Sequence, residues 1–327
     1  MDTRRLTRRT VTGLVAAAGA LAASPLLAQI PGTPEAPPPP DAPIPTAEPD
    51  ASVPTSTSRF EHVTAPVRIN GQGPFVFLVD TGANRSCIST TLATRLGLPA
   101  GPPVAVHTSV GKRVRPTALV DALEIGTRSQ KRVVAPLLPI AMQVDGVLGV
   151  DWLKGQRLVL NFRDKLLEIT APRSETAHRD RVIVPAKSKS GQLTIVDAAM
   201  GDTRINALID SGSQVSMGNG ALRRRLGVQP AGGRPPLRVG LVTVAGEPFH
   251  GELLYMPFMR LGGLQLGNVP IVFTEMHVFH LWELAKVPTV VLGIDLLTEF
   301  DEVAMDYGHA TVRFDVIGDR RLPPVGA

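Results

Sequence analysis

FLVDTGAN, residues 77–84, decides the fold, because it places the carboxylate of Asp80 between an apolar run and a glycine turn. An ionised carboxylate beside a buried strand is costly unless something pairs with it. The stretch ALIDSGS at 207–213 repeats the pattern 130 positions later, with Asp210 in the place of Asp80. The two stretches therefore predict a pair of carboxylates that meet in the folded chain.

Both turns belong to a longer internal repeat. Residues 80–98 align without a gap with residues 210–228, and both segments open on Asp-Thr/Ser-Gly and close on Arg-Leu-Gly. Further along, the apolar-apolar-Gly segment at 147–153 matches the one at 291–297, and two later segments share an apolar pattern, 158–169 and 303–314. A unit that occurs twice indicates a duplicated domain rather than a long repeat array.

The segments between these turns read as short strands. They alternate or run apolar for a few residues and are separated by Gly, Pro and Asn. Asn70-Gly71 and Gly73-Pro74 predict a hairpin before the Asp80 strand. The pattern is typical of an all-β protein with two barrel-like lobes. Short helices are expected at 91–96, at 220–226 and in the turns after Asp151 and Asp295.

These elements, present twice in the same order, resemble the retropepsin-like aspartic proteases. More narrowly, the chain is similar to exported bacterial members in which a single chain carries both lobes. The resemblance covers about residues 59–320 and rests on a strand pair, Asp-Thr/Ser-Gly, apolar-apolar-Gly and a short helix, each found twice. It implies an all-β fold of two acid-protease barrel lobes related by an internal pseudo-two-fold. We expect lobe 1 at 59–178, lobe 2 at 179–320 and a tail at 321–327.

The resemblance also implies the chemistry, an aspartic endopeptidase that hydrolyses peptide bonds of protein or peptide substrates. Asp80 and Asp210 would be the catalytic pair and would activate a water molecule by general acid–base catalysis. Two carboxylates in contact cannot both ionise cheaply, so one pKa rises and the other falls, as in aspartic proteases generally. This chemistry requires no cofactor and no metal. One chain supplies both aspartates, so catalysis needs no dimer.

Neighbouring residues of the two turns have expected supporting roles. Gly82 and Gly212 allow the tight turn and the approach of backbone N–H groups to the carboxylates. Thr81 and Ser211 resemble the hydroxyls that cross-link the two loops in this family.

The fourth position of each turn differs between the two halves. Ser213 can donate a hydrogen bond to Asp210, whereas Ala83 cannot do so for Asp80. This difference predicts that Asp210 is the ionised partner and that Asp80 carries the proton.

Two glycine-containing hairpins are expected to act as flaps over the cleft. The segments at 108–113 and 243–248 hold similar places in the two halves, with Val110, Gly111, Ala245 and Gly246 near the tips. Lys112 and Glu247 give the tips opposite charge, unless both are simply solvated.

An extra segment at 275–287 distinguishes the second half. His277, His280 and Glu283 have a helical spacing that a metal could use. We favour an amphipathic insertion instead, packed through Val278, Leu281, Trp282 and Ala285.

Three other titratable residues have simple structural interpretations. Asp151 and Asp295 are expected to be helix N-caps rather than catalysts. Cys87, the single cysteine, is expected to be a small buried side chain.

The N-terminus has the layout of an export signal. Residues 1–28 hold a basic start, resembling a twin-arginine signal, and a mildly apolar stretch ending at Ala28. Residues 29–58 contain ten prolines and are expected to form an extended linker. The protein is therefore expected to be exported and periplasmic, or tethered to a membrane if the leader stays uncleaved.

The charge balance argues against nucleic acid as a partner. The net charge is +5, but the leader at 1–28 holds four arginines and one aspartate, so little excess remains for the body. Two non-enzymatic alternatives stay open: a catalytically silent envelope protein that binds peptides in the same cleft, and a structural envelope module. Both aspartates and both glycines are present, which favours the enzyme.

Overall fold

The computed structural model describes residues 51–57, 62–140, 142–153, 155–178, 180–189, 192–227 and 235–316. The predicted signal at 1–28, the linker up to residue 50 and the tail at 321–327 lie outside these residues. Among the helices of the described part, none is long and apolar enough to cross a membrane.

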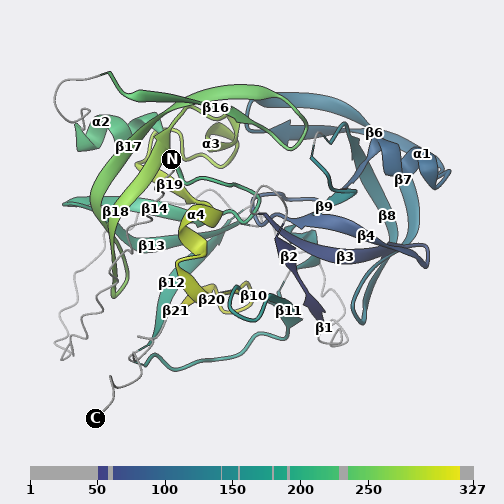
Figure 1. Cartoon of the computed structure of the whole chain (residues 1–327), viewed down its shortest axis with the longest axis horizontal. Helices are drawn as coiled ribbons and strands as arrows, with labels where there is room; N and C mark the ends of the chain where they lie inside the picture. Colours follow the sequence, from purple (N-terminus) through teal and green to yellow (C-terminus); the bar gives the residue numbers. More distant parts are fainter. Residues whose placement is uncertain are drawn as a thin grey trace, which may run out of the picture.

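Two β lobes stand side by side above a shared layer of strands (Figure 1). The predicted all-β fold with two lobes and a few short helices is confirmed. The eight-stranded sheet of lobe 1 runs, from edge to edge, β2 (Ser56–Thr57), β3 (Val63–Ile69), β4 (Gln72–Val79), β9 (Gly146–Leu148), β5 (Cys87–Ser89), β8 (Arg128–Leu138), β7 (Gly111–Ile125) and β6 (Ala100–Thr108).

The lobe 2 strands repeat this arrangement. They follow the order β13 (Gln192–Met200), β14 (Thr203–Ile209), β19 (Thr289–Leu292), β15 (Met217–Gly218), β18 (Leu264–Phe273), β17 (Pro248–Leu261) and β16 (Leu237–Val242). In each lobe the strand before the aspartate pairs in parallel with the apolar-apolar-Gly strand, β4 with β9 and β14 with β19. The short strand after the turn is antiparallel to that strand, β5 to β9 and β15 to β19. The duplication inferred from the sequence is therefore a duplication of strand pairing.

The third layer joins the lobes and differs from the expected lobe boundaries. It holds β1 (Ala51–Pro54), β11 (Leu166–Thr170), β10 (Arg157–Asn161), β20 (Phe300–Asp306), β21 (Thr311–Val316) and β12 (Arg181–Lys189), in that order. β10 belongs to the first half of the sequence but pairs with β20 of the second. β12 continues from this layer into the lobe 2 sheet, so the boundary drawn at residue 178 does not separate two sheets.

The end of the expected linker also forms strands. Residues 51–57 were assigned to the linker at 29–58, yet β1 pairs with β11 and β2 pairs with β3. Ala51 and Val53 are buried while Ser52 and Pro54 are exposed, the alternation of a strand with one face on the core. Pro54 is tolerated because β1 is an edge strand. The proline-rich composition hid this short alternation.

Turns and helix ends follow the local sequence. Asn70 and Gly71 have positive φ values of 51° and 76° and form the predicted two-residue hairpin between β3 and β4. The expected short helices are α1 (Thr90–Arg95), α2 (Gly220–Leu226), α4 (Ile294–Leu297) and a 3₁₀ turn at Val150–Trp152. Ser89 and Asn219 cap α1 and α2 with their side-chain oxygens.

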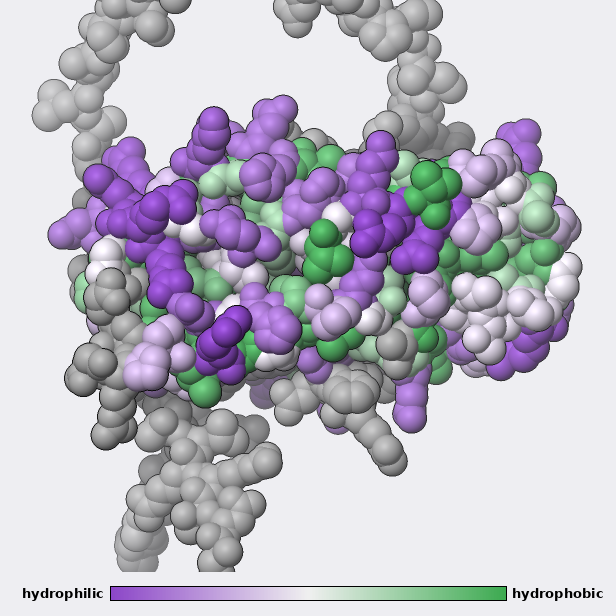
Figure 2. Space-filling view, turned by 90° about the horizontal axis from the view of Figure 1, so that it is seen from above, coloured by the Kyte–Doolittle hydropathy of each residue, from purple (hydrophilic) through white to green (hydrophobic). Residues whose placement is uncertain are grey.

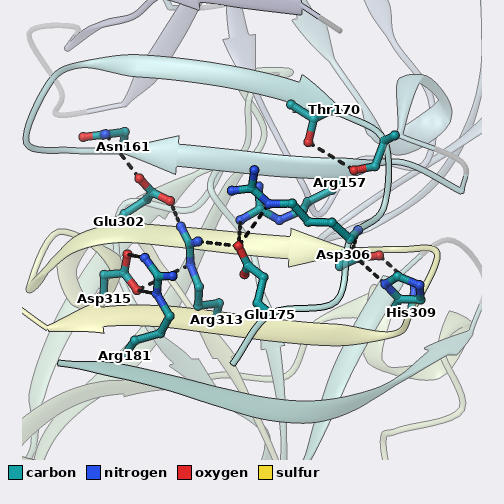
Figure 3. Close-up of polar contacts among 12 residues, drawn as sticks. Arg157, Asn161, Thr170, Glu175, Arg181, Glu302, Asp306, His309, Arg313 and Asp315 are labelled. Atoms are coloured by element: carbon teal, nitrogen blue, oxygen red, sulfur yellow. Dashed lines mark hydrogen bonds and ion pairs between the residues drawn. The ribbon is translucent and has the colours of Figure 1, made fainter. Parts of the chain in front are cut away.

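A buried ion network crosses the shared layer (Figure 3). Glu175 lies in the segment that connects β11 to β12, and its Oε1 accepts hydrogen bonds from Arg157 at 2.9 Å and Arg313 at 2.7 Å. Both guanidinium groups are almost completely buried, with 1% and 4% of the side chain exposed. Because Arg157 is on β10 and Arg313 is on β21, one carboxylate connects the two halves of the chain.

Candidate active site

The two aspartates lie where the lobes meet. Asp80 follows β4 and Asp210 follows β14, and their backbone N–H groups donate to Leu148 and Leu292 of the adjacent strands, each at 3.0 Å. These acceptors belong to the two apolar-apolar-Gly segments. The second repeated motif therefore fixes the position of the first.

The carboxylates of Asp80 and Asp210 form a hydrogen bond with each other. Backbone N–H groups surround them: Gly82 and Ala83 donate to Asp80 Oδ1 at 2.9 Å each, and Gly212 donates to Asp210 Oδ1 at 2.9 Å. The glycines also face the opposite lobe. A Cβ atom at Gly82 would overlap the Asp210 carboxylate, and one at Gly212 would overlap Asp80. Glycine is thus required here for close approach.

A buried cross-link holds the two loops together. Thr81 N–H donates to Ser211 Oγ at 3.1 Å, and Ser211 N–H donates to Thr81 Oγ1 at 3.0 Å. Each hydroxyl in turn donates to the other lobe, Thr81 to Ile209 O at 2.9 Å and Ser211 to Val79 O at 2.7 Å. The cross-link that the resemblance implied for Thr81 and Ser211 is present as four hydrogen bonds.

Burial and mutual contact set the titration of the pair. Burial raises the pKa of Asp80 well above its usual range, and repulsion from Asp210 and the hydrogen bond to it raise this pKa further. Burial also raises the pKa of Asp210, whereas the hydrogen bond from Asp80 and those from the backbone N–H groups lower it. Both pKa values are raised, so the pair holds a proton to a higher pH than an isolated aspartate would.

The hydrogen bond from the Ser213 hydroxyl that was expected to favour charge on Asp210 is not formed. Ser213 Oγ donates to Val215 O at 2.8 Å rather than to Asp210. The contacts that favour charge on Asp210 come from the backbone and from Asp80. The short turn after Asp210 directs the hydroxyl into its own loop, which the sequence did not reveal.

Asp151 and Asp295 do not act as N-caps. The residues at the cap positions are Gly149 and Gly293, which make no side-chain cap. Asp151 Oδ1 instead accepts from Ser86 Oγ at 2.8 Å, and Asp295 Oδ1 accepts from Ser216 Oγ at 2.7 Å.

The two serines complete a structural support that the sequence analysis missed. Ser86 Oγ accepts from Gly149 N–H and Ser216 Oγ accepts from Gly293 N–H, each at 3.0 Å. The signal was available, since Ser86 and Ser216 are separated by the same 130 positions as the aspartates.

The expected flaps are hairpins, and they contact each other. Thr108 at the end of β6 donates through Oγ1 to Glu247 Oε2 at 2.6 Å. Arg113 and Arg115 of β7 lie 3.6 and 3.8 Å from Glu247 Oε1, so they, rather than Lys112, provide the opposite charge. Val244 also packs against a small apolar cluster of lobe 1. The β6–β7 hairpin at 108–113 is called flap 1, and the β16–β17 hairpin at 243–248 is called flap 2. In Figure 1 the β16–β17 hairpin reaches across the top of the molecule toward β6.

Seen from above, the surface that carries both hairpins is mainly hydrophilic, with small separate areas of hydrophobic residues (Figure 2). Val114, Leu237 and Val242 are the most exposed large apolar side chains of the flap strands. Among the described residues, β6 and β16 are the terminal strands of their sheets.

The insertion of lobe 2 forms α3 (His277–Leu281) and packs through Met276, Phe279 and Trp282. Of the four residues expected to pack, Trp282 is buried and Val278 and Ala285 pack against the same cluster, whereas Leu281 is 40% exposed. His277 contacts flap 1 in two ways. Its backbone N–H donates to Ser109 O at 2.7 Å, and its ring Nε2 lies 2.8 Å from His107 Nδ1. His280 and Glu283 are exposed. Within the described residues no group of three or more His, Cys, Asp or Glu side chains is arranged to hold a metal.

Cys87 is buried, as expected, and burial raises the pKa of its thiol to about 12. The thiol is therefore protonated at neutral pH and is no nucleophile.

One protein-family model matches the chain twice. That model is described as aspartyl protease and matches residues 65–152 and 196–296, one region in each lobe. The chain belongs to the aspartyl protease family. Both matched regions contain their Asp-Thr/Ser-Gly turn and their apolar-apolar-Gly strand. Among curated proteins, none matches the chain.

Proposed function

We propose that this aspartyl protease family member is an active endopeptidase that uses Asp80 and Asp210 to hydrolyse peptide bonds. The observation that carries the proposal is the pair of adjoining carboxylates, Asp80 and Asp210, which each receive backbone N–H donors and each lie against the glycine of the other loop. A proton shared within such a pair supplies an acid and a base at one place.

In the proposed reaction, Asp210 accepts a proton from a water molecule while the water oxygen forms a bond to the scissile carbonyl carbon. Asp80 donates its proton to the carbonyl oxygen, giving a neutral tetrahedral diol. The C–N bond then breaks, the nitrogen takes the proton from Asp210, and one diol hydroxyl returns a proton to Asp80. Each step conserves atoms and charge, and the pair regains its starting protonation.

An extended peptide is the substrate shape that the flaps suit. β6 and β16 are the terminal strands of their sheets, and such strands can hydrogen-bond an added strand. The flaps now touch through Thr108 and Glu247, so binding would require this contact to open.

We also propose that the protein acts outside the cytoplasm. The support is the signal-like layout at 1–28 and the proline-rich stretch that follows it. Antibodies against the chain in fractionated cells would test this, and a cytoplasmic signal would contradict it.

The test of the enzyme is cleavage of a diverse peptide mixture by the full chain between pH 3 and pH 8, read by mass spectrometry. Asp80→Asn and Asp210→Asn should each lower the rate by at least about a hundredfold, the lower range of general acid–base contributions. Asp121→Asn, an exposed carboxylate on β7, is the matched control.

The rate should be bell-shaped in pH. The pKa of Asp80 is raised, so its essential proton is lost only as pH rises well above the usual aspartate value of about 4. On the acid side the rate should fall as Asp210 takes up a proton. Wild-type protein that stays folded but cleaves nothing across this range would favour a silent peptide-binding protein instead.

A further inference from the structure

A second pair of polar residues follows the internal repeat. His62 and Gln192 each stand eighteen positions before the aspartate of their own lobe, and they are separated by the same 130 positions. Each is at or next to the start of its lobe's first long strand, β3 and β13. Only 5% of His62 and 3% of Gln192 is exposed. Buried polar side chains are normally held by hydrogen bonds.

Both side chains reach across to the aspartate loop of the other lobe. Gln192 Nε2 donates to Gly82 O at 3.3 Å and to Asn84 Oδ1 at 2.9 Å. His62 forms a hydrogen bond to the backbone of Gly212, which raises its pKa while the larger effect of burial lowers it. A contact that raises the pKa of an imidazole is one in which the ring donates, so the acceptor is the Gly212 carbonyl.

The two glycines are the residues that lie against the catalytic carboxylates. Gly82 faces Asp210 and Gly212 faces Asp80 so closely that neither has room for a Cβ atom. Their N–H groups donate to the aspartates of their own loops. A shift of either peptide therefore changes contacts to both carboxylates, and each peptide is held by the opposite lobe.

We propose that His62 and Gln192 are crossed positioning residues, each of which donates a hydrogen bond that fixes the aspartate loop of the opposite lobe. The Thr81–Ser211 cross-link holds the loops at their centre, and this second pair holds them at the following peptide. Only the expected change in kcat rests on the proposed peptidase activity. The hydrogen bonds from His62 and Gln192 are also expected to affect the titration of Asp80 and Asp210, whether or not a substrate is present.

The chain supplies its own conservative substitution. His62→Gln gives lobe 1 the side chain that lobe 2 uses at the equivalent place, and it keeps a donor. His62→Leu removes the donor at a buried site, and Gln192→Leu does the same in lobe 2. Gln265→Leu, at an exposed position on β18, is the matched control. All variants are made in the full chain, and folding is checked by thermal unfolding.

Two measurements separate positioning from a purely structural role. The first is peptide cleavage, in which His62→Leu and Gln192→Leu should lower kcat about 10- to 100-fold with KM unchanged, as for a misplaced catalytic group. The second is a carbon-13 NMR titration of the Asp80 and Asp210 carboxyl groups, assigned with the two asparagine variants, which needs no substrate.

We expect the leucine variants to shift the titration of the aspartate pair and His62→Gln to restore it. A folded His62→Leu protein that titrates and cleaves like wild type would overturn the proposal, as would a His62→Gln protein no better than His62→Leu. If His62→Leu fails to fold, Gln192→Leu decides by the same criterion. If wild type cleaves no peptide, a shifted titration still supports the positioning role while the proposed peptidase fails.

Discussion

At the scale of single residues, the carboxylate after the apolar run is tolerated because its neighbours are arranged to hold it. Asp80 receives two backbone N–H donors and lies beside Asp210, which helps to raise its pKa. Burial opposes the ionised form of Asp80, and this is the largest cause of its raised pKa.

The raised pKa of Asp80 makes a prediction about stability and pH. Because the folded-state pKa lies above the unfolded value, the favourable contribution is complete below about pH 4 and is lost as pH rises through the folded pKa. Asp80→Asn has no ionisable group at this position, so it does not lose stability in this way as pH rises. The difference between the Tm of the variant and the Tm of wild type should therefore increase with pH. Thermal unfolding at several pH values from 4 to 8 measures this, with Asp121→Asn as control. A Tm difference that does not change with pH would contradict the expectation.

Ser211 makes a second prediction at this scale. Ser211→Ala leaves Thr81 N–H and Val79 O without their buried partner, and each such loss costs about 1–3 kcal/mol. Thr81→Ser keeps a hydroxyl at the equivalent place and should cost less. Denaturant unfolding of both variants tests the comparison. Equal losses would mean that the hydroxyls are not what holds the loops.

At the scale of elements, the flaps and the lobe 2 insertion form a bridge between the two lobes. Glu247 of lobe 2 accepts a hydrogen bond from Thr108 and lies close to Arg113 and Arg115 of flap 1. The rings of His107 and His277 stack, and the backbone N–H of His277 donates to Ser109 O. An α3 that packs on lobe 2 thus also holds the flap of lobe 1.

The histidine contact should respond to pH. The pKa of His107 is lowered by burial and by the nearby charges of His277 and Lys112. The contact between the two lobes therefore favours the neutral form of His107. The stabilisation is complete above about pH 6.5 and is lost as pH falls through the lowered pKa. We expect hydrogen exchange in β6 and β7, corrected for intrinsic rates, to increase on acidification.

His277→Ala is the variant that checks this. It should raise exchange of the flap 1 hairpin at neutral pH and reduce the response to acid. His280→Ala, on the same helix but exposed, should leave both unchanged. Equal behaviour of the two variants would show that the stacked pair does not hold the flap.

At the scale of the whole molecule, the lobes are joined by the shared layer and by Glu175. Glu175→Gln leaves the buried Arg157 with an uncharged partner, whereas Arg313 keeps its contacts with Glu302 and Asp315. Breaking a buried ion pair costs about 3–5 kcal/mol. Burial already lowers the pKa of both arginines, which shows that their charge is costly here.

The matched control for Glu175→Gln is Asp197→Asn. It breaks an exposed pair with Arg260 and should cost about 0–1 kcal/mol. Denaturant unfolding compares the two variants. A Glu175→Gln loss no larger than that of the exposed pair would contradict a joining role.

The sequence by itself determined the local features and their duplication. Strand periodicity, the Asn70-Gly71 turn and the two Asp-Thr/Ser-Gly loops depend on neighbours along the chain, so they could be predicted together with the pairing of Asp80 and Asp210. The same is true of α1 and α2, whose caps lie next to the helices that they end.

Only the tertiary structure decided what lies across the lobes. That β10 pairs with β20, that Ser213 turns away from Asp210, that α3 reaches flap 1 and that His62 reaches Gly212 all depend on side chains from distant segments. The physical reason is that a local pattern fixes which face of a strand is buried, whereas the packing of two lobes fixes which group that face meets.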